Sequence, residues 1–235
     1  AVCPLLVERD PYQKRGESDM KLEQERELLT EYGRRMSRAG LSVGTSGNLS
    51  IYMPEEGLMA ITPSGLDYEA TTPADIVVMD LDAHVVEGER KPSSEWALHT
   101  KFYRRHPAAR AVVHTHSMYC TTLACLGKPL EAVHYAIGAA GTARIPVAPY
   151  RLFGTPELAA AAVETCGDGK AVLLANHGLV AWEGSLPKAF SLARDLEFTA
   201  ELQWRAMAVG TPNILTDSQM AEALERFKTY GQPKK

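Results

Sequence analysis

The segment Ala111–His116 constrains the fold most, because an apolar run there ends in the pattern His-Thr-His. Side chains of a β-strand alternate between its two faces at a rise of about 3.3 Å per residue, so His114 and His116 point to one face. A third histidine, His177, lies inside the strand-like segment 171–182. If the two segments are neighbours in one sheet, three imidazoles converge and leave a coordination position open, as in catalytic zinc sites. The alternative is that these are ordinary half-buried histidines bonded to backbone groups.

The composition argues against several classes of protein. With 235 residues, of which 45% are hydrophobic and 23% charged, the chain has the composition of a soluble globular protein. A formal net charge of −4 with scattered basic residues argues against a nucleic-acid partner. No apolar stretch approaches the roughly 20 residues of a membrane span, and we expect neither a membrane segment nor a secretory leader. The four cysteines form no C-x-x-C pair, which favours reduced thiols and a cytoplasmic location.

The order of predicted elements indicates an α/β fold with a single domain over residues 21–235, preceded by a loose arm at 1–20. Hairpin-like strands in the first half and interleaved helices later predict a mixed, largely antiparallel central sheet covered by helices on both faces. The expected helices are 21–39, 94–106, a short one from about 118, 156–166, 186–209 and 217–227. The expected strands are 49–53, 58–62, 76–81, one from 111, 145–148, and 171–182 with a break at His177-Gly178.

Three loops offer groups that bind phosphate: residues 44–48, 62–65 and 92–94. Each combines free backbone N–H groups with hydroxyl or amide donors, and two contain glycines that allow close backbone approach. Taken singly, each is as well explained as a turn or a helix cap. Glu95 follows the third loop, where it can bind a metal or act as a general base, although a first-turn acid also suits a helix dipole. His99, four residues on, lies on the same helix face and is a rival ligand.

Five motifs, which follow one another in order within residues 21 to 231, resemble the class II aldolase/adducin family. They are Gly44–Ser50, Ile61–Gly65, Pro92–Trp96, Ala111–His116 and Asn176–Leu179. Four further segments favour the branch of that family that cleaves L-fuculose 1-phosphate: His134–Ile137, Ala148–Tyr150, Leu152–Thr155 and Phe227–Gly231.

The resemblance implies one zinc ion per subunit, bound by His114, His116 and His177, with Glu95 as resting ligand and catalytic base. It implies a homotetramer with active sites at the subunit interfaces. Tyr135 would reach the site from a neighbouring subunit as a proton donor, Tyr230 would close over the aldehyde, and Phe153 would line the aldehyde side. The substrate phosphate would be held by Gly44, Asn48, Thr62, Ser64, Gly65, Ser93 and Ser94.

The implied reaction is the reversible, zinc-dependent aldol cleavage of L-fuculose 1-phosphate to dihydroxyacetone phosphate and L-lactaldehyde, a step of fucose metabolism. One alternative is an aldolase or dehydratase acting on deoxy- or methylthiopentulose 1-phosphates. Another is L-ribulose-5-phosphate 4-epimerase, although such proteins typically have aspartate at the position of Glu95. A non-enzymatic alternative is an adducin-like binding scaffold, against which the retained histidines argue.

Overall fold

The computed structural model describes residues 20–227. The expected arm and Tyr230 lie outside this range, apart from Met20. The α-helices are α1 (Glu23–Arg38), α2 (Trp96–Arg105), α3 (Met118–Cys125), α4 (Pro156–Cys166), α5 (Leu186–Val209) and α6 (Asp217–Phe227), and two 3₁₀ helices are η1 (Pro73–Asp75) and η2 (Tyr135–Ala140). The strands are β1 (Asn48–Met53), β2 (Leu58–Ile61), β3 (Val77–Asp80), β4 (Val85–Glu87), β5 (Ala111–Thr115), β6 (Leu130–Glu131), β7 (Arg144–Ile145), β8 (Val147–Ala148), β9 (Ala171–Leu174) and β10 (Gly178–Glu183).

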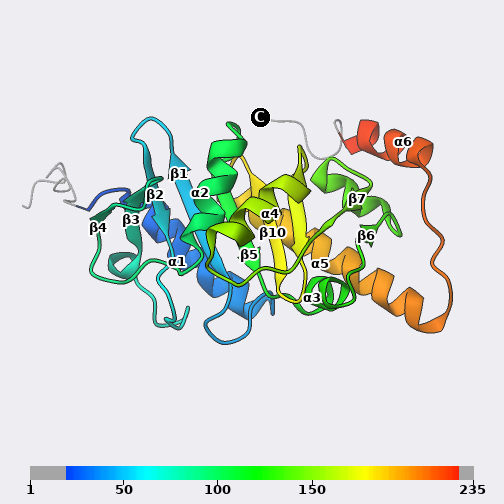
Figure 1. Cartoon of the computed structure of the whole chain (residues 1–235), viewed down its shortest axis with the longest axis horizontal. Coiled ribbons are helices and arrows are strands. Elements are labelled where there is room, and N and C mark those ends of the chain that lie inside the picture. Colours follow the sequence, from blue (N-terminus) through cyan, green and yellow to red (C-terminus); the bar gives the residue numbers. More distant parts are fainter. Residues whose placement is uncertain (1–19, 228–235) are drawn as a thin grey trace, which may run out of the picture.

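Eight strands form one central sheet in the order β4-β3-β2-β1-β5-β10-β9-β8 (Figure 1). Every pairing within it is antiparallel except that of β8 with β9. β6 and β7 form a separate two-stranded sheet. The predicted mixed, largely antiparallel sheet is therefore confirmed.

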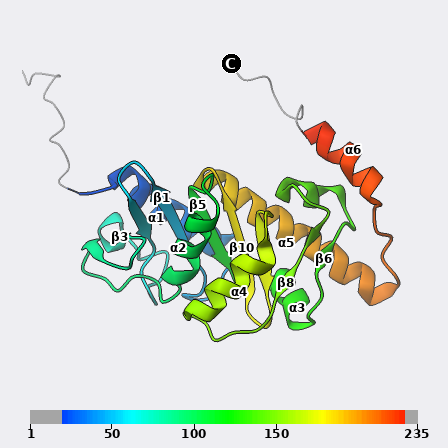
Figure 2. The ribbon, with the colours of Figure 1, turned by 45° about the horizontal axis from the view of Figure 1, so that its top comes forward.

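Helices cover both faces of this sheet, as predicted (Figures 1 and 2). Alternating residues of β5 show the division: Ala111 and Val113 pack with α1, α3 and α5, whereas Val112 packs with α2 and α4. The same alternation continues to the end of β5, so the side chain of His114 points to the face of the sheet that α2 covers. No helix in residues 20–227 combines the length and apolar character that a membrane span requires.

The prediction of a single interrupted strand at residues 171–182 is wrong. β9 and β10 are two antiparallel neighbours, and the turn between them contains Asn176 and His177. Asn176 has a φ of 56°, a left-handed conformation that asparagine tolerates better than most residues and that lets the chain reverse sharply. Periodicity alone could not separate one interrupted strand from two strands, because both sides are continuous apolar runs.

Candidate metal and substrate site

Four side chains from three separate regions meet at one end of the central strands. Glu95, His114, His116 and His177 each offer a ligand atom, and these atoms lie within 4.8 Å of one another. Glu95 is the residue at the N-terminal end of α2, the first two histidines lie at the end of β5, and His177 lies in the β9–β10 turn. The strand pairing of β5 with β10 brings the turn beside the end of β5. The structure thus brings together all four predicted ligands.

Two glycines allow this close approach. A Cβ atom at Gly178 would overlap the carbonyl oxygen of Thr115, and one at Gly47 would lie 2.9 Å from the carbonyl oxygen of His114. Any larger side chain at either position would push a neighbouring segment away from the end of β5. Both glycines therefore set how near His177 and the 44–48 loop come to the histidine pair.

The His114 ring is oriented by the backbone behind it. Its Nδ1 lies 2.9 Å from the carbonyl oxygen of Leu179. A carbonyl only accepts, so Nδ1 carries a proton and Nε2 is the ring nitrogen directed at the cluster. That Nε2 lies 3.0 Å from Nε2 of His116 and 3.1 Å from Oε2 of Glu95.

Burial and mutual charge determine the protonation of the cluster. Burial, followed by the charge on His114, lowers the pKa of His116 to about 3 and that of His177 to about 4. Burial acts to raise the pKa of Glu95, but the adjacent imidazoles and the Asn48 amide outweigh it and hold this pKa well below its ordinary value. At neutral pH the site therefore presents a carboxylate and the neutral imidazoles of His116 and His177. Burial acts to lower the pKa of His114, but the charge and hydrogen bond of Glu95 outweigh it and raise this pKa.

The donor set fits a divalent metal ion. Three imidazole nitrogens and a carboxylate are the ligands that zinc accepts in catalytic sites, and they are all turned inward. Oε1 of Glu95 is buried and accepts no hydrogen bond within residues 20–227, with Nε2 of His177 at 3.5 Å. Such an orphaned carboxylate oxygen needs a positive partner or a proton, and either a metal or a substrate hydrogen supplies one.

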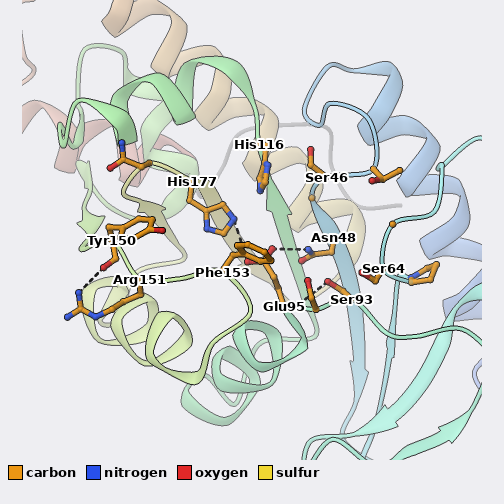
Figure 3. A pocket seen from close by; sticks show the side chains of 16 residues that line it. Ser46, Asn48, Ser64, Ser93, Glu95, His116, Tyr150, Arg151, Phe153 and His177 are labelled. Carbon is orange, nitrogen blue, oxygen red and sulfur yellow. Dashed lines mark hydrogen bonds and ion pairs between the residues drawn. The ribbon is translucent and has the colours of Figure 1, made fainter.

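The cluster opens into a cavity of about 370 Å³ (Figure 3). Asn48, Ser64 and Ser93 lie on one side of it, and Tyr150 and Arg151 lie on the opposite side. The full lining comprises Thr45, Ser46, Gly47, Asn48, Pro63, Ser64, Gly65, Ser93, Ser94, Glu95, His116, Tyr150, Arg151, Phe153, Asn176 and His177.

Two of the seven predicted phosphate residues do not line this cavity. The Thr62 hydroxyl accepts the backbone N–H of Leu49, and the Thr62 carbonyl accepts that of Ser93, so Thr62 joins β1, β2 and the 92–94 loop. Gly44 lies outside the lining at the start of its loop. The remaining five predicted phosphate residues all line the cavity: Asn48, Ser64, Gly65, Ser93 and Ser94.

Three other residues that the sequence singled out lie at different distances from the cavity and the histidine cluster. Phe153 lines the cavity and is 62% exposed. Tyr135 is the first residue of η2, stacks on His134 with ring centroids 4.4 Å apart, and lies outside the lining. His99, the rival ligand, is completely buried and bonds to Asn48 and Ser50 rather than to the cluster.

Arg151 is the lining residue that sequence reasoning missed. It is exposed at the cavity mouth, where its guanidinium donates to the carbonyl oxygen of Tyr150. It lies between the segments Ala148–Tyr150 and Leu152–Thr155, so its neighbours were singled out but it was not. The charge of Arg151 between these two segments was the available signal, because a guanidinium is suited to binding anions.

Comparisons with known proteins found a family match, curated relatives and a solved structure of the same fold. The family described as Class II Aldolase and Adducin N-terminal domain matches residues 27–204. A 5-deoxy-D-ribulose 1-phosphate aldolase of Bacillus thuringiensis serovar kurstaki is 46% identical over 213 residues, which are 91% of this chain and 100% of that protein. An L-fuculose phosphate aldolase of Escherichia coli O6:H1 is 44% identical over 197 residues, 83% of this chain and 90% of that one. A solved L-fuculose 1-phosphate aldolase matches with a TM-score of 0.85 at 42% identity, covering 87% of this chain and 96% of the other.

Proposed function

Since the chain belongs to the class II aldolase and adducin family and is a metal-dependent aldehyde-lyase, we propose that it reversibly cleaves a ketose 1-phosphate between C3 and C4. The products are dihydroxyacetone phosphate and a short aldehyde. One observation carries the proposal: the cavity combines a cluster of three histidines and a glutamate with loops rich in hydroxyl and backbone donors.

We propose zinc as the metal, held by His114, His116 and His177, with Glu95 as a fourth ligand in the resting enzyme. Bound zinc acts as a Lewis acid that stabilises the negative charge developing on the three-carbon half of the substrate. The neutral state of His116 and His177 supports this choice, because imidazole binds a metal only through an unprotonated nitrogen.

Glu95 is the proposed general base. In the condensation direction it removes a proton from C3 of dihydroxyacetone phosphate, and in cleavage it returns that proton after the C3–C4 bond has broken. Its carboxylate is ionised at neutral pH, as a base must be, and Oε1 has no other hydrogen-bond partner within the described residues. A tyrosine would protonate the aldehyde oxygen in condensation.

The phosphate is assigned to the wall formed by Asn48, Ser64, Gly65, Ser93 and Ser94. Ser93 and Ser94 lie just before Glu95, the N-cap residue of α2, so this wall lies beside the N-terminal end of that helix, where the helix dipole favours an anion. The position of Arg151 at the mouth supports an anionic substrate as well. Neither Thr62 nor Gly44 lines the cavity, so we propose that these two residues stabilise the loops and do not bind the phosphate.

L-Fuculose 1-phosphate and 5-deoxyribulose 1-phosphate are the two candidate substrates. The sequence motifs favour the first, and the relative whose whole length matches this chain is named for the second. Both give the same three-carbon product and an aldehyde that ends in a methyl group, which suits the aromatic ring of Phe153 at the cavity. We place the reaction in the cytoplasm, consistent with the free thiols of Cys120, Cys125 and Cys166.

The test is release of dihydroxyacetone phosphate by zinc-loaded and chelator-stripped protein. L-Fuculose 1-phosphate, 5-deoxyribulose 1-phosphate, 5-methylthioribulose 1-phosphate and L-ribulose 5-phosphate are compared by kcat/KM. We expect zinc-dependent release from at least one of the 1-phosphates. Epimerisation of the 5-phosphate alone would reassign the reaction, and binding of no metal by carefully prepared protein would favour a scaffold.

We further propose that Tyr135 acts in the active site of a neighbouring copy within a homotetramer. Its side chain is 55% exposed and lies outside the cavity of its own chain, which supports a role in another subunit. Tyr135→Phe and Glu95→Gln are each expected to be nearly inactive alone. Mixed oligomers made by refolding the two variants together should regain activity, because some sites then receive both intact residues. No recovery in mixtures shown to be hetero-oligomers would contradict the proposal.

A further inference from the structure

A continuous chain of buried hydrogen bonds leads away from Glu95 into the core. Oε2 of Glu95 lies 3.1 Å from Nδ2 of Asn48, and Oδ1 of Asn48 lies 2.5 Å from Nε2 of His99. Nδ1 of His99 lies 2.6 Å from the hydroxyl of Ser50, which lies 2.6 Å from the hydroxyl of Tyr103. All five residues are at most 5% exposed.

The chain results from two matching spacings. Glu95, His99 and Tyr103 are four residues apart on one face of α2, a rise of about 6 Å for each step. Asn48 and Ser50 are two residues apart on the facing side of β1, a rise of about 6.6 Å. Because the two repeats nearly coincide, each strand residue lies between two successive helix residues and bonds to both.

The charge of Glu95 gives every bond in the chain one direction. An ionised carboxylate only accepts, so the Asn48 amide must donate its N–H and present its carbonyl oxygen to His99. His99 then donates from Nε2 and accepts at Nδ1 from Ser50, which accepts from Tyr103. Burial lowers the pKa of His99 to about 3, so the ring is neutral and has a single N–H to donate.

From this directed chain we infer that His99 is a positioning residue which fixes the Asn48 amide and thereby leaves Oε1 of Glu95 as the proton-carrying oxygen. Oε2 is occupied by the Asn48 N–H, whereas Oε1 accepts no hydrogen bond within the described residues. Without the His99 donor, the Asn48 amide can turn its oxygen toward Glu95, which repels the carboxylate and displaces it. The kinetic consequence of this inference rests on the proposed function, whereas the direction of the hydrogen bonds among Glu95, Asn48 and His99 does not.

The kinetic test compares His99→Gln with His99→Asn. Glutamine places its amide N–H near the position of Nε2 and can still donate to Asn48, whereas asparagine reaches only the position of Nδ1. We expect His99→Asn to lower kcat and the exchange of the C3 proton of dihydroxyacetone phosphate with solvent deuterium by about 10- to 100-fold, with little change in KM or bound metal. His99→Gln should recover most of that loss.

A matched control is available on the same helix. His106, at the C-terminal end of α2, is also buried and stacks between Phe102 and Trp182, but it does not touch the site. His106→Asn should leave kcat unchanged. Equal rates for His99→Asn and His99→Gln would overturn the inference. If His99→Asn does not fold, the protonation of the His99 ring nitrogens in the wild-type protein decides the question.

An activity-independent measurement separates this inference from the proposed function. Long-range ¹H–¹⁵N spectra of protein labelled in histidine report which ring nitrogen of His99 carries the proton. We expect the Nε2–H form at neutral pH, and an Nδ1–H form would overturn the inference even in an active enzyme. Wild-type protein that neither cleaves a ketose phosphate nor exchanges the C3 proton would instead contradict the proposed function.

Discussion

Gly178 lies so close to the carbonyl oxygen of Thr115 that a Cβ atom at position 178 would overlap it. This contact joins the β9–β10 turn to the end of β5, the two segments that carry the histidines. We expect Gly178→Ala to lower the free energy of unfolding by about 1 to 3 kcal/mol and to reduce bound metal, because the strands must separate. Denaturant melts and metal analysis measure both effects.

Gly210 is the matched control for that substitution. It has an extended φ of 176° and nothing within 4 Å of an added Cβ, so Gly210→Ala should leave both quantities unchanged. Normal stability and metal content in Gly178→Ala would contradict the prediction, because they would show that the turn can accommodate a Cβ atom at position 178.

Replacing the proposed base should separate catalysis from folding. Glu95→Gln retains the shape of the side chain and can still accept the Asn48 N–H, but it cannot take up a proton. We expect turnover to fall by a factor on the order of 10² to 10⁴ with an unchanged circular dichroism spectrum. Steady-state kinetics measure this, and a wild-type rate would remove Glu95 from the mechanism.

Removing one imidazole should release the metal. His116→Ala leaves two histidines and Glu95, and we expect bound zinc to fall well below the roughly one ion per chain of a catalytic site. His84→Ala is the control, because His84 is an exposed histidine that pairs only with Asp80 among its described neighbours. Inductively coupled plasma mass spectrometry after dialysis measures the ratio, and full occupancy in His116→Ala would contradict the ligand assignment.

The carboxylate of Asp75 should make stability depend on pH. The Thr72 hydroxyl, and then Arg90, hold its pKa below the ordinary value. A lowered folded pKa contributes stability that is complete above the unfolded pKa of about 3.9 and is lost as the pH falls through the folded pKa. We expect Asp75→Asn to be less stable than wild type by about 1 kcal/mol at pH 7, with a difference that shrinks below about pH 4.

Urea melts across this pH range test the prediction for Asp75. Glu89→Gln, a change to an exposed carboxylate in the neighbouring loop, is the control and should show a much smaller difference at every pH. A stability difference for Asp75→Asn that is constant from pH 7 to pH 2 would mean that its charge has no part in the effect.

The aromatic side chain that lines the cavity should set aldehyde preference. Phe153→Ser replaces an aromatic ring at the cavity with a small polar side chain. We expect the ratio of kcat/KM between a methyl-ended and a hydroxymethyl-ended ketose 1-phosphate to fall by about tenfold, as one apolar contact is worth about 1 to 3 kcal/mol. Parallel kinetics with the two substrates measure the ratio, and an unchanged ratio would place the aldehyde elsewhere.

Sequence reasoning predicted the helices and the long strands because their patterns are regular. It missed η1, β4, β6 and η2, which span two to six residues each and are too short for a period to be visible, and the strand expected at 145–148 is divided into β7 and β8. It placed His177 inside a strand, although the residue lies in a turn, and still predicted that the histidines would meet because the neighbouring strands pair.

The site was predictable where alternation or helix spacing decides direction, and less so in loops. Strand alternation correctly placed His114 and His116 together. Helix spacing placed His99 on the face of Glu95, but one step of about 6 Å along the axis carries it over β1 and away from the cluster. Gly44 and Thr62 were predicted to contact the phosphate but do not line the cavity, because residue types alone do not determine the path of a loop backbone.

The matched spacing of α2 and β1 also determines where this chain can tolerate changes in length. One residue inserted between positions 95 and 103 would turn the remainder of the helix by about 100° and separate the helix side chains from Asn48 and Ser50. The hairpin tip at residues 54–57, by contrast, joins β1 to β2 beyond the last of these bonds and is partly exposed. Insertions should therefore accumulate at the hairpin during evolution, while the helix segment keeps its length even where its residue types change.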